Sequence, residues 1–292
     1  MKIIVNFVSV QDLLKPHHHD DEQFGDITIL SLDHPGAQDP LYRARRDQIA
    51  NVARTYACDP SITPIIEYTP EEHGVWNTVT KKLKPLHEKY ISNLHLRSQK
   101  ELNISTESIP QLHILSEAIE RKNGFRLAPT VGLIHPRDFL SALGERTMLC
   151  TQYIRHASKP EYTPEPDVIH EVIGHAPAFM DRDMVDFSVT LGSMAKRANA
   201  QELVELELLY WYTIEFGLIQ EKGNVKAFGA GLLSSFCELE HAMNTPEIHR
   251  PFRLDEFINT PYDFSAMQTV LFVMPSFTEI QKQVTKHFQH IN

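Results

Sequence analysis

Two histidines, His170 and His175, lie in a short segment that also carries three acidic residues, Glu165, Asp167 and Glu171. The residues around them are mostly apolar, so we expect the segment to be buried. A single buried histidine is more often a hydrogen-bonded core residue, but imidazoles grouped with carboxylates are typical ligands of Zn²⁺ and Fe²⁺. The clustering therefore makes this segment a candidate metal site.

The spacing of the two histidines differs from that of the zinc proteases, which carry His-Glu-x-x-His. That motif works because residues four apart share a helix face, and here the fourth position is Gly174. Five residues apart, His170 and His175 would point about 140° away from each other on an ideal α-helix. We therefore expect the helix to stop near Gly174, with Pro177 preventing its continuation, so that the two side chains can converge.

A third metal ligand would have to come from another part of the chain, and Glu215 is the best candidate. It lies between Ile214 and Phe216 in a strongly apolar stretch, where a carboxylate without a partner is costly. On composition alone, an ion pair with an arginine explains Glu215 equally well. Together with the two histidines, Glu215 would complete the set of two histidines and one carboxylate that is typical of non-haem Fe(II) enzymes. Zinc accepts the same ligands, so the residue types leave it open.

Several longer motifs identify a family that the chain resembles. They are Asp33-His34-Pro35-Gly36 and the residues numbered 39–46, 124–127, 150–156, 162–167, 210–218 and 228–235. In this order they resemble the core of the aromatic amino acid hydroxylases, with the phenylalanine enzymes most similar, over roughly residues 33–280. The resemblance implies a mainly α fold, a single catalytic domain of the aromatic amino acid hydroxylase type with a few short strands.

The resemblance implies a role for each matching position. The residues His170, His175 and Glu215 fall on the iron ligands. Arg155 falls on the arginine that pairs with the substrate carboxylate, and Asp167 falls on the acid that orients this arginine. Other positions that match the amino acid pocket are Thr163, Pro166, Trp211, Phe216, Gly231 and Ser234. Ser234 would also orient one of the iron-binding histidines.

A pterin site beside the iron is also implied. The flat pterin would lie against the ring of Phe139, with Gly132, Leu133 and Leu140 nearby. Glu171 matches a glutamate that contacts the pterin, and we expect Glu171 and Tyr210 to be the catalytic side chains. The same loop carries His135-Pro136 in place of a serine pair of the animal phenylalanine enzyme, a difference that bears on pterin affinity.

The implied function is a tetrahydropterin- and Fe(II)-dependent monooxygenase that hydroxylates L-phenylalanine to L-tyrosine, a step of phenylalanine catabolism. Tetrahydrobiopterin or a related pterin would supply two electrons, and dioxygen would supply the oxygen atom. Trp211 favours phenylalanine or tyrosine over tryptophan as the substrate, because tryptophan hydroxylases usually carry phenylalanine there. Two other classes compete: a zinc hydrolase built on the same ligands, and a non-catalytic protein that binds a metal or an amino acid.

Composition excludes several other classes. The formal net charge of −10 argues against nucleic acid or an anionic membrane as the main partner. The three cysteines are too few and too far apart for a disulfide framework or a cysteine-based zinc cluster. The N-terminus carries no recognisable signal peptide, and no stretch reaches the ~20 apolar residues of a membrane span. We therefore expect a cytoplasmic protein.

Helical periodicity dominates the chain after residue 40. A capping box with proline at the first helical position starts one helix at Thr69, and glycine 124 should close another. The last helix should begin at Ser276 and carry one apolar face. Helices are predicted at residues 108–121, 137–148, 181–196, 201–220 and 231–243, and short strands at residues 3–8 and 225–228.

These patterns divide the chain into an N-terminal extension, residues 1–32, and a catalytic iron and pterin domain, residues 33–292. The extension contains the tract His17-His18-His19, which we interpret as a solvated loop. It is too short for an independent regulatory fold. The final apolar face is too short for a coiled coil of three to four heptads. We therefore expect a monomer.

Overall fold

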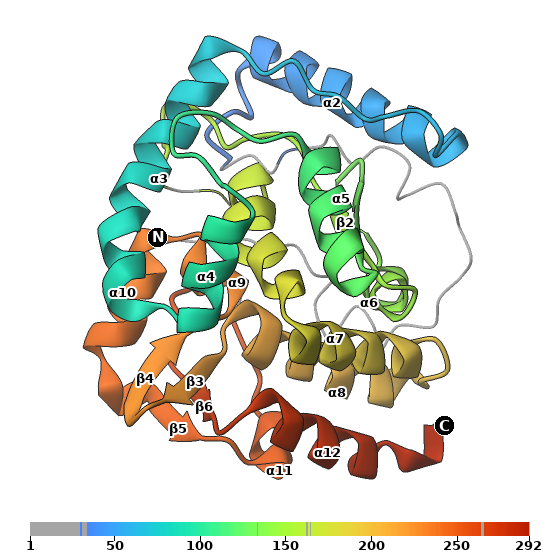
Figure 1. Ribbon diagram of the computed structural model, residues 1–292, viewed down its shortest axis with the longest axis vertical. Helices are drawn as coiled ribbons and strands as arrows, with labels where there is room; N and C mark the ends of the chain where they lie inside the picture. Colours follow the sequence, from blue (N-terminus) through green and yellow to red (C-terminus); the bar gives the residue numbers. More distant parts are fainter. Residues whose placement is uncertain are drawn as a thin grey trace.

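The computed structural model describes residues 30, 34–132, 134–161, 163, 165–263 and 266–291 (Figure 1). Helices make up most of this part of the chain, as predicted. The α-helices are α2 (Pro40–Cys58), α3 (Pro70–Tyr90), α4 (Asn93–Glu101), α5 (Leu112–Asn123), α6 (Pro136–Gly144), α7 (Arg182–Ala195), α8 (Ala200–Tyr210), α9 (Ala230–Leu233), α10 (Phe236–Asn244), α11 (Leu254–Phe257) and α12 (Phe277–His287). Two π-helical turns, η1 (His170–His175) and η3 (Trp211–Glu215), interrupt the α-helical pattern. Shorter 3₁₀ turns are η2 (Ala176–Met180), η4 (Pro246–Ile248) and η5 (Gln289–Ile291).

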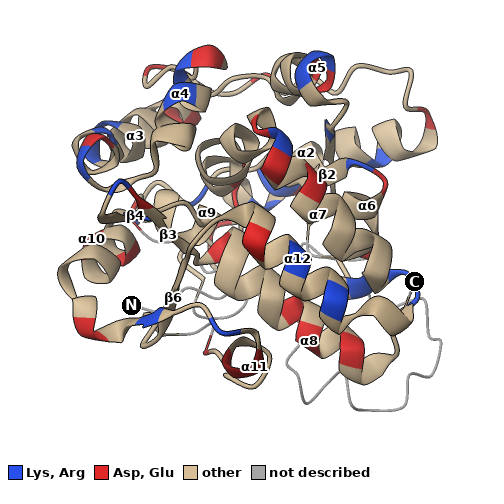
Figure 2. Cartoon of the chain, turned by 60° about the horizontal axis from the view of Figure 1, so that its bottom comes forward, with Lys and Arg blue, Asp and Glu red and all other residues tan. Residues whose placement is uncertain are grey.

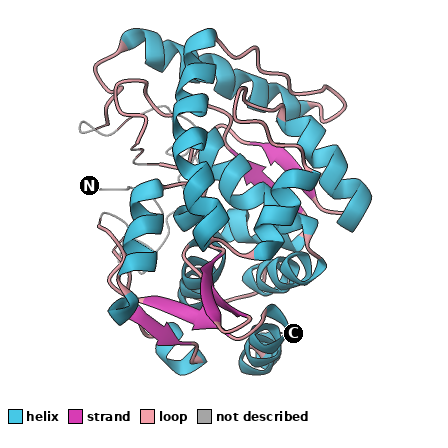
Figure 3. Ribbon diagram, turned by 60° about the vertical axis from the view of Figure 1, so that its left-hand side comes forward, coloured by secondary structure: helices cyan, strands magenta, loops and turns pink. Residues whose placement is uncertain are grey.

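The strands are short and form two separate groups among the helices (Figure 3). Strands β1 (Arg126–Pro129) and β2 (Thr147–Cys150) make a parallel pair. The second group has the order β4-β3-β6-β5, formed by β4 (Asn224–Ala227), β3 (Leu218–Glu221), β6 (Leu271–Met274) and β5 (His249–Pro251). The predicted strand at residues 225–228 is thus confirmed as β4. The predicted strand at residues 3–8 and the histidine tract lie outside the described residues.

Helix α3 shows how local sequence starts an element. The side chain of Thr69 accepts a hydrogen bond from the backbone N–H of Glu72, whose side chain accepts one from the N–H of Thr69. This is the predicted capping box. The apolar residues Trp76, Val79 and Leu83 then recur at three- and four-residue steps and are fully buried.

Helices α6 and α7 cross at a pair of glycines. A Cβ placed on Gly192 would lie 2.1 Å from the backbone nitrogen of Gly144, and one placed on Gly144 would lie 2.7 Å from the Gly192 carbonyl carbon. Arg137, on α6, donates hydrogen bonds to the carbonyls of Ala195 and Ala198 at the end of α7. The crossing therefore fixes α6, and with it Phe139, against the rest of the core.

Several predicted helix boundaries are wrong for one physical reason, because strand pairing and tight packing override the local period. The helix predicted at 137–148 ends at Gly144, and Met148 lies in β2, paired with Leu127 of β1. The helix predicted at 201–220 ends in the π turn η3, after which the chain enters β3. The range 231–243 is divided into α9 and α10 at Ser234 and Ser235.

Other predicted ends are close to those observed. The range 181–196 corresponds to α7, for which Asp181 is the N-cap. The helix predicted at 108–121 begins later, at Leu112, and Gly124 ends it in the left-handed conformation (φ 65°) as expected. Among the described residues, no helix combines the length and apolar character needed to cross a bilayer.

The C-terminal helix α12 packs on its own domain. Its apolar residues Phe277, Ile280, Val284 and Phe288 are all buried, and its neighbours include α7. Acidic residues of α8 face the basic end of α12 (Figure 2). Here His287 lies 3.0 Å from Glu205 and His290 lies 2.9 Å from Glu202.

The glycine crossing predicts a sharp difference between two substitutions. Gly192→Ala should lower the free energy of unfolding by about 1–3 kcal/mol, because its methyl group would overlap the backbone of α6. Gly74→Ala, in the exposed middle of α3 with no atom near the new Cβ, should raise it by roughly 0.5–1 kcal/mol. Urea unfolding measures both values, and equal effects of the two changes would contradict this packing.

Candidate metal centre and adjoining cavities

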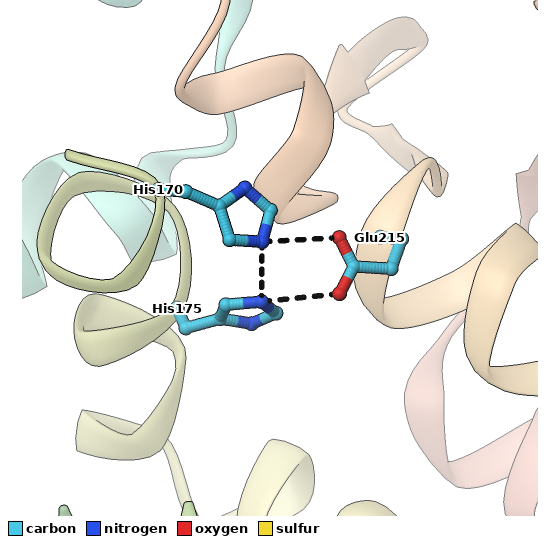
Figure 4. A group of neighbouring side chains, drawn as sticks. All are labelled: His170, His175 and Glu215. Carbon is cyan, nitrogen blue, oxygen red and sulfur yellow. Dashed lines mark hydrogen bonds and ion pairs between the residues drawn. The ribbon is translucent and has the colours of Figure 1, made fainter. Parts of the chain in front are cut away.

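Three buried side chains converge in the interior of the fold (Figure 4). The Nε2 atoms of His170 and His175 are 3.0 Å apart. The carboxylate of Glu215 faces both rings, with Oε2 3.4 Å from Nε2 of His170 and Oε1 3.1 Å from Nε2 of His175. One donor atom from each residue falls within 4.8 Å of the others. Among the described residues Glu215 pairs with no arginine, so the structure supports the metal-ligand alternative.

The backbone brings the two histidines together through a π-helical turn. Residues His170–His175 form η1, in which hydrogen bonding at i→i+5 places residues five apart on nearly the same face. The prediction that the helix stops at Gly174 is therefore wrong, and the helix widens there and continues into η2. Gly174 instead allows close packing, because a Cβ at this position would lie 2.8 Å from the Cβ of Ala230.

Ser234 fixes the orientation of His170. Its hydroxyl donates a hydrogen bond to the carbonyl of Ala230, at 2.8 Å, so its oxygen can accept one from Nδ1–H of His170, at 3.1 Å. The Nε2 atom is then the one aimed at Glu215. Ser234 therefore lies where it can hold the His170 ring, and its role in orienting a metal ligand stays a prediction.

The three groups together attract positive charge. Burial opposes ionisation of Glu215, but His175 and His170 lower its pKa well below the ordinary value. Burial also disfavours the charged form of His170, yet Glu215 raises the pKa of that histidine above its usual range. A divalent cation would supply the same charge to the same atoms in place of a proton. The donor set therefore fits a metal ion.

Arg155 and Asp167 form a buried, two-pronged ion pair. The Nε and Nη2 atoms of Arg155 donate to Oδ2 and Oδ1 of Asp167 at 2.8 and 2.9 Å. Asp167 also accepts hydrogen bonds from the backbone N–H groups of Arg155 and His170. Burial alone would raise the pKa of Asp167, but the charge and hydrogen bonds of Arg155 lower it. The pair is therefore ionised and tied to the first residue of the metal-binding turn.

A cavity adjoins both the ion pair and the metal ligands. It contains most of the residues predicted for the amino acid pocket. Its walls are Arg155, Glu161, Thr163, Glu165, Pro166, His170, Glu215, Phe216, Gly231, Ser234 and Ser235. A Cβ on Gly231 would lie 2.6 Å from the ring of Phe216, so glycine leaves room for that ring. Asp167 lies behind Arg155, outside the wall, consistent with an orienting role.

A second, aromatic cavity lies on the other side of Trp211. Its walls are Pro136, Phe139, Leu140, Glu207, Tyr210, Trp211 and Tyr262. Trp211 separates the two cavities, because its ring packs against Phe216 at 4.6 Å and against Tyr262 at 4.0 Å between centroids. The predicted pocket residue Trp211 thus lies one layer behind Phe216. The predicted pterin residues Phe139 and Leu140 share this second cavity with Tyr210.

Glu171 follows His170 in η1, and its side chain is hydrogen-bonded to Thr151. Its Oε1 accepts hydrogen bonds from the N–H and the hydroxyl of Thr151, at 3.2 and 3.1 Å, while its buried Oε2 has no hydrogen-bond partner among the described residues. Burial raises the pKa of Glu171 above its ordinary value. Gly132 is buried but is not a wall residue of either cavity, and Leu133 lies outside the described residues.

Comparison with known proteins agrees with this arrangement. The model of the family described as biopterin-dependent aromatic amino acid hydroxylase matches residues 10–292. The chain belongs to this family. Tyrosine 3-monooxygenase of Schistosoma mansoni is 41% identical over 263 residues, covering 88% of this chain and 56% of that protein. Phenylalanine-4-hydroxylase of Rattus norvegicus is 41% identical over 259 residues, covering 87% and 57%. The chain thus spans slightly more than half the length of these curated relatives.

Solved structures of bacterial phenylalanine hydroxylases share the fold. The apo enzyme of Colwellia psychrerythraea 34H superposes with a TM-score of 0.74 at 28% identity, over 78% of this chain and 89% of that one. The Chromobacterium violaceum enzyme with bound iron(III) and oxidised 7,8-dihydrobiopterin gives a TM-score of 0.73 at 27% identity, over 77% and 82%. The mainly α hydroxylase fold expected from the sequence is therefore confirmed.

One residue beside the cavity, Arg46, was not predicted from the sequence as a site residue. Arg46 is buried, forms an ion pair with the wall residue Glu165, and lies 3.7 Å from the ring centroid of Tyr153. His34 is 3.6 Å from the same carboxylate. Arg46 and His34 both belong to motifs that the chain shares with the family, so the resemblance could have marked them as important. The residues next to them in the sequence do not indicate that their partner is Glu165.

The orientation of His170 by Ser234 can be tested by binding. Ser234→Ala should weaken Fe(II) binding by about 10–100-fold, because the imidazole loses the hydrogen bond that directs Nε2 at the metal. Anaerobic Fe(II) titration measures the affinity. Ser234→Thr, which keeps the hydroxyl, should retain more of it, and an unchanged affinity in Ser234→Ala would remove Ser234 from this role.

The carboxylate ligand makes a separate prediction. Glu215→Gln should weaken Fe(II) binding by more than about tenfold and abolish hydroxylation, because a neutral amide is a poor ligand for a hard cation. The circular dichroism spectrum should stay unchanged. Glu205→Gln, which changes a carboxylate that pairs with His287, is the matched control. Full iron content with normal turnover in Glu215→Gln would show that Glu215 is not a ligand.

Proposed function

We propose that the chain is a monooxygenase that uses Fe(II) and a tetrahydropterin to hydroxylate L-phenylalanine to L-tyrosine. The observation that carries the proposal is that one cavity is bounded both by two of the metal-binding residues, His170 and Glu215, and by Arg155, a cation suited to an amino acid carboxylate. Family membership and the bacterial phenylalanine hydroxylase folds support it.

In this proposal the chain's own residues bind and orient, while bound iron and reduced pterin supply the activation of dioxygen. The residues His170, His175 and Glu215 would hold the iron, and two of them, His170 and Glu215, also line the cavity. All three side chains are buried, which would limit the access of water to the bound iron. We assign to Glu171 and Tyr210 the positioning of reactants next to the iron.

Arg155 would hold the substrate through its carboxylate. Asp167 accepts one hydrogen bond each from Nε and Nη2 of Arg155, so N–H groups on Nη1 and Nη2 are left to meet a substrate carboxylate. The walls Pro166, Phe216 and Gly231 offer apolar contact to a ring, and Thr163 and Ser234 add small polar groups. Trp211 supports the wall from behind Phe216.

The pterin would lie in the aromatic cavity. Phe139 offers a flat face, and Leu140 and Tyr210 lie beside it. We assign Glu171 to the pterin as well, on the strength of the resemblance. We include Gly132 and Leu133 in the pterin loop on the strength of the resemblance. The catalytic unit would be residues 33–292, with residues 1–32 as an extension.

Tyrosine is the second candidate substrate, because the Schistosoma tyrosine 3-monooxygenase is as similar to this chain as the rat phenylalanine-4-hydroxylase. The part of the wall formed by Pro166, Phe216 and Gly231 is apolar and favours phenylalanine, whose ring carries no hydroxyl that needs a hydrogen-bond partner. An aerobic assay should therefore show oxygen uptake that requires both tetrahydrobiopterin and Fe(II). It should give tyrosine from phenylalanine with a larger kcat/KM than any product from tyrosine.

The same assay separates the competing classes. If oxygen uptake is faster with tyrosine than with phenylalanine, the enzyme is a tyrosine hydroxylase and not a phenylalanine hydroxylase. A protein that binds zinc and never consumes oxygen with pterin would overturn the whole proposal, because a hydrolase or a binding protein would then explain the ligands.

The ion pair between Arg155 and Asp167 predicts a change in the KM for phenylalanine. Arg155→Lys keeps the charge but loses the planar two-pronged geometry toward Asp167. Breaking part of a buried charged pair should cost about 2 kcal/mol, which is roughly a 30-fold rise in KM for phenylalanine. Steady-state kinetics measures it. A KM for the pterin that rises while the KM for phenylalanine stays constant would assign Arg155 to the wrong ligand.

We also propose that the chain is a monomer located in the cytoplasm. The support for a monomer is α12, whose apolar residues Phe277, Ile280 and Val284 are buried within their own domain and thus do not offer a face for a partner helix. Sedimentation velocity at micromolar concentration should give a single species of about the chain mass, 33.5 kDa. A stable tetramer would contradict this role of α12.

A further inference from the structure

Glu207 is a buried carboxylate that the proposed chemistry does not yet use. It lies on α8, between Leu206 and Leu208, and Glu207 is only 6% exposed to solvent. Neither Oε1 nor Oε2 has a hydrogen-bond partner among the described residues. Buried polar groups are nearly always hydrogen-bonded, so an acid with both oxygens unpartnered requires an explanation.

The surroundings of Glu207 are aromatic and apolar. It shares the second cavity with Phe139, Tyr210, Trp211 and Tyr262. Burial raises the pKa of Glu207 to about 8, with Arg137 opposing the rise. Two hydrogen bonds from Arg137 end on the carbonyls of Ala195 and Ala198 instead, so this guanidinium does not satisfy the acid.

Other buried glutamates of the chain show the contrast. Glu72 is held by Arg45 and by the backbone of Thr69, and one oxygen of Glu171 is held by Thr151. Glu207 has no such partner and faces a cavity. An unpartnered acid destabilises the folded state, and such exceptions to local consistency are expected at functional sites.

The position of Glu207 relative to Phe139 suggests what fills the cavity. Tyr210 follows Glu207 by three residues, so the two side chains lie on the same face of α8. The rings of Tyr210 and Phe139 meet edge to face at 5.3 Å between centroids. A flat heterocycle against Phe139 would therefore present its rim, where its N–H or O–H donors lie, to the carboxylate.

We propose that Glu207 accepts hydrogen bonds from the pterin that lies against Phe139, and that it thereby determines which pterins bind well. This inference rests on the proposed function, since it needs a pterin in the aromatic cavity. The donors are either the amino and ring N–H groups of the pterin or the hydroxyls of its side chain, and a carboxyl oxygen of Glu207 can accept a hydrogen bond from both kinds of group.

Direct binding tests the inference without turnover. Calorimetry of the Fe(II)-loaded full chain under anaerobic conditions would use oxidised 7,8-dihydrobiopterin, which cannot react, and 6-methyl-7,8-dihydropterin, which lacks the hydroxyls. Glu207→Gln should weaken binding of 7,8-dihydrobiopterin by about tenfold, and Glu207→Leu should weaken it further. Glu205→Gln, on the same helix but directed at His287, should bind like the wild-type chain.

The second pterin locates the donors. A loss confined to 7,8-dihydrobiopterin assigns the contact to the side-chain hydroxyls, and an equal loss for both pterins assigns it to the ring. A loss confined to 7,8-dihydrobiopterin supports Glu207 as a specificity residue, whereas an equal loss supports the contact but overturns its role in choosing between these pterins. Wild-type affinity for both pterins in Glu207→Gln and Glu207→Leu would overturn the inference while leaving the proposed function intact. No binding of either pterin by the wild-type chain would overturn the proposed function itself.

Thermal unfolding without pterin gives an independent readout. Glu207→Gln should raise the Tm, because it replaces an unpartnered acid by a neutral group of the same shape in an apolar setting. Gain of stability with loss of pterin affinity is the signature of a ligand-binding acid. A fall in Tm together with unchanged pterin affinity would show that Glu207 has only a structural role.

Discussion

The site depends on one geometric constraint, which is that two ligands five residues apart must reach the same point. An α-helix cannot do this, because His170 and His175 would point to different faces. The π turn η1 solves the problem by widening the helix for one turn. The second π turn, η3, ends at the third proposed ligand, Glu215. Such turns are uncommon, and they occur frequently at functional sites. Here one π turn carries the two histidines and the other carries Glu215, as expected for a functional site.

Close packing around the ligands holds these turns in place. Gly174 of η1 lies directly against Ala230 of α9, and Gly229 lies so close to the carbonyl of Glu215 that a Cβ there would be 2.4 Å from its oxygen. The same short helix α9 is followed by Ser234, which orients His170. One element thus supports both π turns, so the metal ligands and the cavity wall at Gly231 are positioned together.

Asp167 extends this coupling to the substrate side. It accepts a hydrogen bond from the backbone of His170 and holds Arg155 by a two-pronged pair. A shift of the metal-binding turn would therefore move the clamp that we assign to the substrate carboxylate. On the other side, Trp211 of η3 separates the two cavities, so the same turn that supplies Glu215 also forms the partition between the proposed substrate and pterin sites.

The sequence predicted elements that local patterns determine. The capping box at Thr69 and the apolar face of α12 needed only neighbouring residues, and both are confirmed. Residue types alone suggested the metal triad. The sequence could not predict η1, because the wide turn is stabilised by contact of Gly174 with Ala230, far along the chain. For the same reason Met148 was predicted in a helix, although its pairing with Leu127 makes it a strand residue.

Some site residues were identified only through family resemblance. Arg155 would pass for a surface residue, since its partner Asp167 is twelve residues away and joins it through an irregular loop. Glu207 could not be identified from the sequence, because an acid within an apolar helix pattern does not reveal whether its carboxylate has a partner in the folded chain. Pairing between distant residues and the burial of an acid without a partner arise only in the folded state. A local sequence pattern therefore cannot predict them.

The central claim is that two π turns together build a single iron site, and anomalous X-ray diffraction at the iron edge tests it most directly. Crystals grown with Fe(II) under anaerobic conditions should show one strong peak within coordination distance of Nε2 of His170, Nε2 of His175 and the carboxylate of Glu215. The peak should be absent in Glu215→Gln crystals grown in the same way. A peak elsewhere, or none at these three side chains in the wild-type protein, would contradict the account.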